Sequence, residues 1–416
     1  MTVRSVAGTN WSGTHTYRGT RVVEATSIPE VQEAVARASA VRALGTRHSF
    51  NAIADSDETL VSVLAIPADP ALDLEAGTVT EGGGIRYGVL AGFLESQGRA
   101  LHNTGSLPHI SLAGAHATGT HGSGNTNGVL ATAIRGLDLV TADGSLRRIT
   151  EPDELAVAAV SLGALGVVVR TTLQTEPTYQ VRQDVYTDLP WDAVLEDLDA
   201  VTGAAYSVSL FTDWARDVVG SALVKRRLDR DPPGGEDFFG ATRTPGDMGQ
   251  TGLAENWTEV GRAGPWCDRL PHFRMEGTPS VGEEIQSEWF VPRPNGPAAL
   301  RAVRALAPRL RPELIVSEIR TVAGDNLPLS PAYGRDSLAI HFTWRAHPRE
   351  VAALVPVVEQ ALAPHSPRPH WGKVHTPAGS WDALYPRLDD VREVVARLDP
   401  GRKFRNDFLD RVMGPG

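Results

Sequence analysis

The sequence predicts an α+β protein with two domains. A chain of 416 residues is longer than one hydrophobic core usually supports. Helical and strand patterns alternate over the first part of the chain, whereas strand patterns dominate between Pro177 and His375. We therefore expect an N-terminal α+β domain over residues 1–178 and a second, sheet-based domain over residues 179–375. Residues 376–416 are expected to form a C-terminal segment that returns to the first domain.

The N-terminal domain is expected to open on a helix and a strand. Ser27 and Glu30 stand at the spacing of a capping box, with Pro29 in the first turn, which predicts a helix that reaches about Ala38. A strand over residues 41–45 follows. The other predicted elements of this domain are a loop over residues 46–50, a hairpin over residues 72–75 and 78–81, a helix over residues 87–97, a second hairpin that begins at residues 137–142 and a buried strand over residues 165–173.

Two features are expected after the first domain. Residues 229–264 are rich in loop-forming residues and predict an irregular insertion in the second domain. Residues 391–408 predict a helix that is followed by a closing turn.

The composition excludes several classes of function. The net charge is −10 and the sequence has no basic block, so a nucleic-acid partner is not expected. No apolar stretch approaches the roughly 18 residues of a membrane helix, and the N-terminus lacks an apolar signal core, so we expect a cytoplasmic protein without a membrane anchor. Cys267 is the only cysteine, which excludes an internal disulfide, a thiolate zinc site and an iron–sulfur cluster. His365, His370 and His375 share neither a helix face nor a strand face, so no metal site is expected.

Glycine is most frequent in residues 105–128. Glycine lets backbone amides approach a phosphate closely, and it adopts positive φ without strain. Residues 118–124 therefore predict a cradle for a pyrophosphate, although each glycine alone would also suit an ordinary turn. The P-loop pattern is absent, and Gly82, Gly84 and Gly88 miss the GxGxxG spacing by one residue. The glycines by themselves indicate a dinucleotide or another phosphate-bearing ligand that loops hold.

Two segments place polar side chains on one face of a strand. Glu318 and Arg320 are separated by a single apolar residue, which puts both on the same face. His341 and Thr343 follow the same pattern. If the two strands are neighbours, the four side chains form one polar patch; the alternative is a solvated surface ion pair. Lys373 lies among apolar neighbours, which indicates partial burial.

Three segments of the first domain resemble the vanillyl-alcohol-oxidase superfamily of flavoproteins. They are residues 41–50, which include His48, residues 105–114 and residues 117–124. Within that superfamily the chain resembles the bacterial alditol oxidases (xylitol and sorbitol oxidases) nearly from end to end. The segments that resemble this branch in particular are residues 206–214, 317–323, 341–344 and 368–374.

The resemblance implies a two-domain FAD-binding fold, with the FAD between two α+β subdomains and His48 joined through its imidazole to the flavin 8α-methyl. The other residues that it assigns to FAD are Ala43, Leu44, Gly45, Thr46, Arg47, Ser49, Ser106, Ser111, Gly114, Thr118, Gly119, Thr120, His121 and Val168. Arg47 departs from the glycine that often precedes this histidine. It would be strained if the position needs positive φ, or it could offer charge to the pyrophosphate.

The reaction that the resemblance implies is the oxidation of the terminal CH–OH of a polyol such as xylitol or sorbitol to the aldose. Hydride would pass to flavin N5, and O2 would be reduced to H2O2. Arg320 and Lys373 would engage the reacting hydroxyl as the proton-handling pair, with His341 in support, because a cationic pair stabilises a developing alkoxide. Which group takes the proton is left open. The residues that would bind the other hydroxyls are Ser106, Glu318 and Thr343.

Two alternatives stay open at this point. An aldonolactone oxidase or dehydrogenase of the same superfamily shares the flavin loops but takes a ring-shaped substrate. A catalytically idle flavin-binding protein would have no need for the set Glu318, Arg320 and Lys373, which argues against it. We also expect the protein to act as a monomer.

Overall fold

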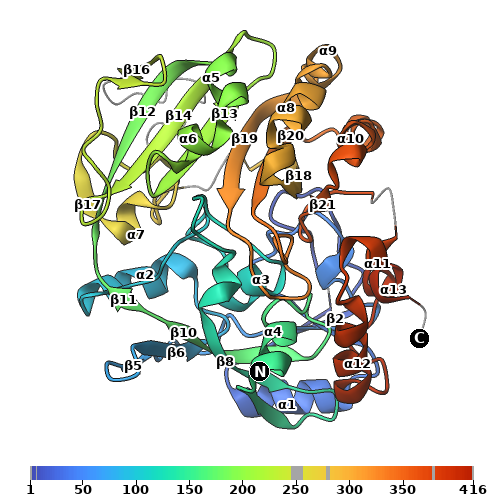
Figure 1. Cartoon of the computed structure of the whole chain (residues 1–416). Helices are drawn as coiled ribbons and strands as arrows, with labels where there is room; N and C mark the ends of the chain where they lie inside the picture. The colour runs from blue at the N-terminus through green and yellow to red at the C-terminus, as the bar shows by residue number, and fades with distance from the viewer. Residues whose placement is uncertain (1, 6, 245–255, 278–281, 377–379, 415–416) are drawn as a thin grey trace.

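The computed structural model describes residues 2–5, 7–244, 256–277, 282–376 and 380–414 of the chain. Figure 1 shows a first region built from the N-terminal part of the chain and a second region dominated by long strands, with the C-terminal helices lying back beside the first region. The α+β class is confirmed. No helix in the described ranges is both long enough and apolar enough to cross a membrane.

The N-terminal domain begins with a four-stranded sheet. The strands are β1 (Thr2–Arg4), β2 (Arg21–Glu24), β3 (Val41–Ala43) and β4 (Thr59–Ser62), in the order β1-β2-β4-β3. β4 pairs in parallel with both β2 and β3, whereas β1 is antiparallel to β2. The predicted helix is α1 (Ile28–Arg37), which covers the sheet because Val31 and Val35 lie on its buried side with the strand valines.

The capping interaction at the start of α1 differs from the prediction by one residue. Ser27 occupies the N-cap position, but its side chain makes no capping hydrogen bond. The Glu30 carboxylate accepts hydrogen bonds from Thr26 N–H at 2.8 Å and from Thr26 Oγ1 at 3.0 Å instead. The prediction of a Ser27–Glu30 capping box is therefore wrong, because the carboxylate reaches back past the N-cap to the preceding residue.

The second sheet of this domain is antiparallel, in the order β5-β6-β10-β8-β9. Both predicted hairpins are confirmed by the pairs β5–β6 and β8–β9, and the predicted buried strand is β10. The bounds of these strands are β5 (Ala71–Asp73), β6 (Thr78–Gly82), β8 (Ile134–Val140), β9 (Leu146–Ile149) and β10 (Val167–Gln174). The accompanying elements are α2 (Tyr87–Ser96), α3 (Leu112–Ala117), α4 (Pro152–Ala159) and the short paired strands β7 (Arg99–Ala100) and β11 (Glu176–Pro177).

The second domain is built on a ten-stranded sheet, in the order β15-β16-β12-β14-β13-β19-β20-β18-β21, with β17 paired to β12. The strands are β12 (Gln180–Pro190), β13 (Ser207–Thr212), β14 (Val218–Arg227), β15 (Asp237–Phe238), β16 (Ala241–Thr244), β17 (Ala263–Pro265), β18 (Glu284–Pro292), β19 (Leu314–Val322), β20 (Ser337–Arg345) and β21 (Arg368–Pro369). The helices are α5 (Trp191–Glu196), α6 (Leu198–Gly203), α7 (Trp266–Arg269), α8 (Gly296–Arg304), α9 (Ala307–Leu310) and α10 (Pro348–Leu362). The predicted insertion at residues 229–264 contains β15, β16 and β17, and residues 245–255 of it lie outside the described residues.

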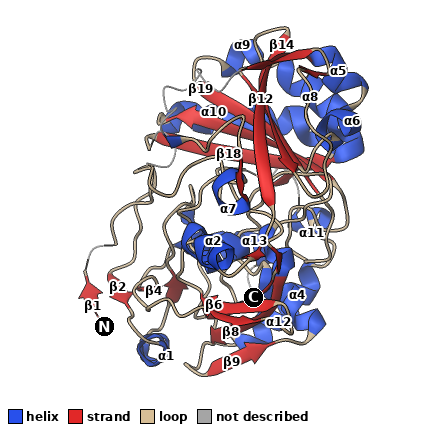
Figure 2. Ribbon diagram, turned by 90° about the vertical axis from the view of Figure 1, so that its left-hand side faces the viewer, coloured by secondary structure: helices blue, strands red, loops and turns tan. Residues whose placement is uncertain are grey.

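Side chains alternate between the two faces of this sheet. Ile319, Ile340 and Phe342 belong to a hydrophobic core that α6, α8 and α10 cover (Figure 2). The neighbouring residues on the same strands, such as Glu318 and His341, point to the opposite face, toward the N-terminal domain. The helices thus pack on the apolar face of the sheet, and the opposite face carries the polar side chains.

The helices of the C-terminal segment pack against elements of the first region. These helices are α11 (Trp381–Leu384), α12 (Leu388–Leu398) and α13 (Asp407–Met413). The buried guanidinium of Arg42 donates to Phe404 O at 2.7 Å and to Gly163 O at 2.8 Å, which ties the segment to the loops of the first domain. The predicted helix and closing turn over residues 391–408 are confirmed by α12 and the turns that follow it up to residue 405. The sequence did not predict α13, which Asn406 caps by accepting a hydrogen bond from Leu409 N–H. The domain limits at residues 178 and 375 remain the division that we propose.

Candidate active site

A cavity of about 470 Å³ lies where the loops of the N-terminal domain meet the polar face of the large sheet. The loops that line it belong to residues 42–49, 105–121 and 161–168. Strands β18, β19 and β20, together with the segment at residues 370–373, line its other end. Both domains therefore contribute walls to one continuous space.

The residues that the resemblance assigned to FAD line this cavity, with the exception of Gly119. Gly119 has φ +68, and a Cβ atom at this position would lie 2.8 Å from Pro331 Cδ. Glycine is needed there because the loop that carries Pro331, from the second domain, packs directly on the backbone. The absence of a side chain at Gly119 therefore serves the packing between two loops.

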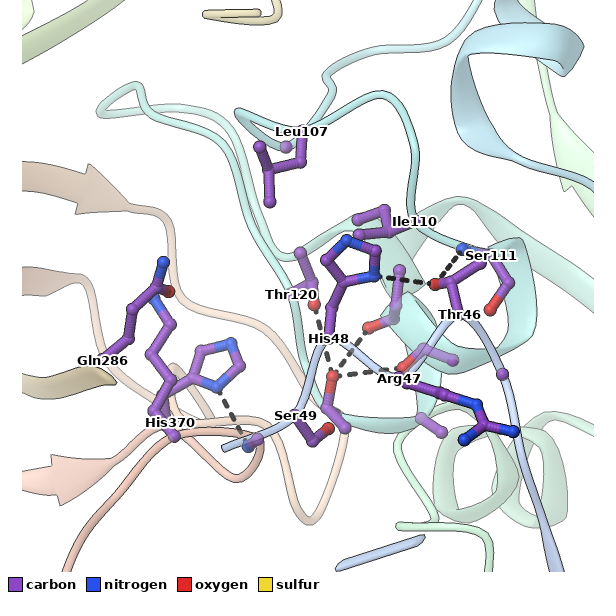
Figure 3. Close-up of a pocket in the computed structure, with 18 of the residues that line it drawn as sticks. Thr46, Arg47, His48, Ser49, Leu107, Ile110, Ser111, Thr120, Gln286 and His370 are labelled. Carbon is purple, nitrogen blue, oxygen red and sulfur yellow. Dashed lines mark hydrogen bonds between the residues drawn. The ribbon is translucent and has the colours of Figure 1, made fainter. Parts of the chain in front are cut away.

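His48 lies in the wall at the N-terminal-domain end, where Figure 3 shows its ring beside Thr46 and Ser111. His48 Nδ1 is 3.0 Å from Thr46 Oγ1, and this hydroxyl oxygen accepts from Ser111 N–H at 3.1 Å. The ring stacks on Trp11 with 5.3 Å between ring centroids. His48 Nε2 is buried without a hydrogen-bond partner among the described residues. Burial, together with His109, lowers the pKa of His48 to about 4, so the imidazole is neutral and keeps a lone pair.

Arg47 adopts φ 65, which is the strained conformation that the sequence raised as one of two possibilities. Its guanidinium donates to Ala7 O and, at 3.2 Å, to Thr9 O. The group also lies 5.6 Å from the centre of the Tyr17 ring. Figure 3 shows the guanidinium pointing away from His48. Arg47 thus anchors the N-terminal segment to the loop that carries His48.

Replacing Arg47 tests the strain directly. Arg47→Gly and Arg47→Ala both remove the guanidinium contacts, but only alanine retains a Cβ atom at positive φ. The glycine variant should be more stable than the alanine variant by about 1 kcal/mol. Denaturant unfolding of the two variants under identical conditions measures this difference. Equal stabilities would contradict a strained backbone at this position.

The cavity walls fit an extended dinucleotide such as FAD. A Cβ atom at Gly45 would lie 2.6 Å from Ser111 Oγ, and one at Gly83 would lie 2.6 Å from Val168 O. Glycine at these positions therefore lets the loops close tightly around the cavity. The unpartnered Nε2 of the neutral His48 ring in the same wall suits a covalent attachment.

Strands β19 and β20 are neighbours, so the four polar side chains that the sequence singled out do form one patch. In the strand register, Glu318 of β19 lies opposite His341 of β20, and His341 lies opposite Glu288 of β18. These three residues make one row across the sheet. Thr343 lies on the same face and pairs with Gln286 of β18.

Arg320 forms the first ion pair of the patch. Its Nε donates to Glu318 Oε1 at 2.5 Å, and its Nη2 donates to Glu318 Oε2 and to Ser106 Oγ. His272 Nε2 is 2.8 Å from Glu318 Oε1. Burial acts to raise the pKa of Glu318, but Arg320 and His272 outweigh it and hold this pKa well below its ordinary value. Glu318 is therefore a buried carboxylate ion with Arg320 fixed against it.

Lys373 forms the second ion pair. Its Nζ donates to Glu288 Oε2 at 2.6 Å and lies 2.8 Å from His341 Nδ1. His341 Nε2 is 3.0 Å from Thr343 Oγ1. The predicted partial burial of Lys373 is confirmed, since 17% of its side chain is exposed. Burial lowers the pKa of Lys373 although Glu288 opposes the shift, and burial with Lys373 lowers the pKa of His341 to about 3.

Sequence reasoning missed several polar residues of this wall. Glu288 and Gln286 alternate with apolar or small residues on β18, which is the pattern that identified Glu318 and Arg320 and could have identified them as well. Glu288 also faces His121 of the glycine-rich loop, with 3.2 Å between Oε1 and Nε2. His272 lies in a segment without periodicity, so no local signal indicated it.

The comparisons with known proteins agree with this arrangement. Residues 20–150 match the FAD binding domain family, and residues 282–412 match the D-arabinono-1,4-lactone oxidase family. The chain is 46% identical over 413 residues to an alditol oxidase of Streptomyces sp. (strain IKD472 / FERM P-14339), covering 97% of this chain and 98% of the relative. It is 32% identical to an L-gulono-1,4-lactone dehydrogenase of Mycobacterium tuberculosis, covering 98% of this chain and 99% of the relative.

The solved structures add the fold. Cholesterol oxidase from B. sterolicum superposes with a TM-score of 0.78 at 16% identity, over 99% of this chain and 97% of that chain. This likeness, together with the FAD-binding match, confirms the two-domain α+β FAD-binding fold. The 46% identity to the Streptomyces alditol oxidase, over nearly the whole length of both chains, identifies the family. The chain belongs to the alditol oxidase family of the vanillyl-alcohol-oxidase flavoprotein superfamily.

Proposed function

We propose that this protein is an FAD-dependent alditol oxidase that oxidises the terminal CH–OH of a polyol such as xylitol or sorbitol to the aldose. The balanced reaction converts R–CH2OH and O2 into R–CHO and H2O2. One observation carries the proposal: two buried ion pairs, Arg320–Glu318 and Lys373–Glu288, face the cavity of a chain that is 46% identical to an alditol oxidase. We also propose that the protein acts as a monomer.

The cations at this end of the cavity suit a reacting hydroxyl. As the hydroxyl loses its proton, negative charge develops on oxygen, and Arg320 and Lys373 would stabilise that charge. Glu318, two residues before Arg320 on β19, holds that guanidinium, and Glu288 of β18 holds Lys373, which fixes both cations before substrate arrives. Ser106, Glu318 and Thr343 would bind the other hydroxyls, since each offers a hydrogen-bonding oxygen to the cavity.

The neutral imidazole of His341 connects the second ion pair to Thr343. Its Nδ1 faces the Lys373 ammonium and accepts a hydrogen bond from it, so the ring hydrogen lies on Nε2 and points to Thr343 Oγ1. His341 thereby supports both groups without carrying charge. FAD, held by His48 and the glycine-rich loops, would supply the acceptor for the hydride that leaves the carbon.

Acid denaturation and a substrate assay test the proposal together. Acid-precipitated protein should give a yellow pellet, because covalently bound flavin stays with the denatured chain. Xylitol added to the native enzyme without oxygen should bleach the flavin, and in air it should produce H2O2. A colourless pellet would rule out the covalent bond. Bleaching by an aldonolactone but by no alditol would establish the alternative that the D-arabinono-1,4-lactone oxidase match over residues 282–412 favours.

Loss of the His48 imidazole should separate flavin binding from attachment. A His48→Ala variant is expected to bind FAD without a covalent bond or to lose it, because the ring that lines the cavity is removed. The matched control is His347→Ala, which removes a surface histidine that pairs with Glu313. Flavin fluorescence on a denaturing gel measures attachment. Covalent flavin that persists in His48→Ala would place the bond elsewhere.

A further inference from the structure

Lys225, on β14, is buried behind the active site with 1% of its surface exposed. Its Nζ donates to Leu270 O at 2.5 Å and to Pro271 O at 3.1 Å, and it lies 3.0 Å from His272 Nδ1. Burial, together with Arg320, lowers the pKa of Lys225, while Glu318 opposes the shift. The three acceptors around Nζ match the three hydrogens of an ammonium group and favour the charged form. Lysine is almost never fully buried unless its charge is paired. Here its contacts are two backbone carbonyls and one ring nitrogen. His272 is therefore the one side chain among these three contacts.

His272 joins Lys225 to the Glu318 carboxylate. Burial, together with Lys225, lowers the pKa of His272 to about 3, so its ring is neutral and carries one hydrogen. When the ammonium donates to Nδ1, the ring hydrogen lies on Nε2 and points at Glu318 Oε1, 2.8 Å away. The opposite tautomer would turn an unprotonated Nε2 toward an ionised carboxylate, with two lone pairs facing each other. The geometry therefore selects the Nε2–H form.

The same segment also fixes the other partner of Arg320. The backbone N–H groups of His272 and Phe273 both donate to Ser106 O, at 3.1 and 3.2 Å. Ser106 Oγ accepts from Arg320 Nη2, which also binds Glu318. His272 Nε2 is itself 3.3 Å from that Nη2 atom. Two routes thus run from His272 to the Arg320 guanidinium, one through a carboxylate and one through a serine.

We propose that Lys225 and His272 are positioning residues for alditol oxidation: the lysine and Glu318 together fix the tautomer of His272, and the imidazole holds Glu318 so that Arg320 keeps one orientation at the cavity wall. Neither residue needs to touch the reacting hydroxyl. This inference rests on the proposed function for its kinetic consequence, whereas the tautomer of His272 is a property of the protein alone. The two statements can therefore be tested separately.

The first measurement is the tautomer. Nitrogen-15 NMR of the histidine-labelled holoenzyme distinguishes Nδ1–H from Nε2–H rings, and the His272 signal is assigned by its loss in His272→Gln. The wild type should show Nε2–H, and Lys225→Met should shift the Nδ1 resonance, because Nδ1 loses the hydrogen bond that it accepts from Lys225. Lys403→Met is the matched control, because Lys403 also donates to a backbone carbonyl, at 2.9 Å from Val35 O, but lies away from the cavity. A wild-type His272 ring with its hydrogen on Nδ1 would overturn the proposed chain of contacts from Lys225 through His272 to Glu318.

The second measurement is kinetic. Loss of a hydrogen bond to a charged group should lower kcat/KM with xylitol roughly 10- to 100-fold in Lys225→Met, mainly through kcat. His272→Gln keeps an N–H donor for Glu318 and should retain more activity than His272→Phe, which has none. If His272→Gln and His272→Phe lose the same fraction of kcat/KM, and that loss follows their loss of thermal stability, the role of His272 is merely structural and the proposal is overturned. If Lys225→Met does not fold, the His272 pair decides. A wild type that oxidises no alditol would refute the proposed function, while the NMR result would still test the proposed chain of contacts.

Discussion

A Lys373→Met variant should retain its flavin and its fold but turn over alditols roughly 10²- to 10³-fold more slowly than the wild type. Lys373 faces the cavity as one of two cations held against carboxylates, and methionine occupies similar space without charge. The ammonium would stabilise charge that exists only as the hydroxyl loses its proton. Its loss should therefore lower kcat and kcat/KM together and leave KM nearly unchanged. Stopped-flow reduction of the flavin by xylitol measures the affected step.

The pH profile gives a second view of the same group. Burial lowers the pKa of Lys373 from its ordinary value, so the ammonium loses its proton at a lower pH than a surface lysine does. Activity that requires the charged form is present below this lowered pKa and should fall as pH rises through it. Lys373→Met should lack that part of the alkaline decline. A variant with normal kcat at neutral pH would show that the reaction does not use this charge.

A Glu288→Gln variant should lose roughly 10- to 100-fold in kcat, although Glu288 lies behind the lysine. Glu288 Oε2 accepts from Lys373 Nζ at 2.6 Å, and its charge opposes the effect of burial on that lysine. Without the charge, the pKa of Lys373 should fall further, and the alkaline decline in activity should move to lower pH. Steady-state rates with xylitol across the pH range measure both effects.

The buried position of Glu288 adds a cost in stability. Removing one partner of a buried ion pair leaves the other charge uncompensated, which typically destabilises a protein by about 3–5 kcal/mol. The Glu288→Gln/Lys373→Met double variant should recover part of that loss, because neither charge remains. Glu313→Gln is the control, since it breaks a surface pair with His347. A pH profile that is unchanged in Glu288→Gln would sever the link between this carboxylate and the lysine.

Local patterns in the sequence were sufficient for much of the fold. The hairpins at β5–β6 and β8–β9, helix α2 and the alternation on β19 and β20 each depend on residues close together in the chain. Such patterns encode which face of a strand is polar, because side chains alternate with a period of two. The loop around His48 was singled out through its resemblance to a family rather than through periodicity.

The features that the sequence did not reveal share one physical cause. A glycine in a loop carries no local sign of its neighbour, and the neighbour of Gly119 proved to be Pro331 of the second domain. The direction of the Arg47 guanidinium depends on Ala7 and Thr9, about 40 residues away in the chain. Helix α13 was missed because the Asn406 cap lies within what looked like a closing turn.

By itself, the sequence determined the fold class, the family resemblance, the shared strand face of Glu318 and Arg320 and the partial burial of Lys373. Only the tertiary structure decided which group stands beside each of them. Lys373 meets Glu288 across 85 positions of the chain, and Glu318 meets His272 across 46. Strand register and the packing of the two domains bring these residues together, although they are far apart in the sequence. The protonation of a buried lysine or histidine follows from such neighbours, so the chemistry of this site could be assigned only once the chain was folded.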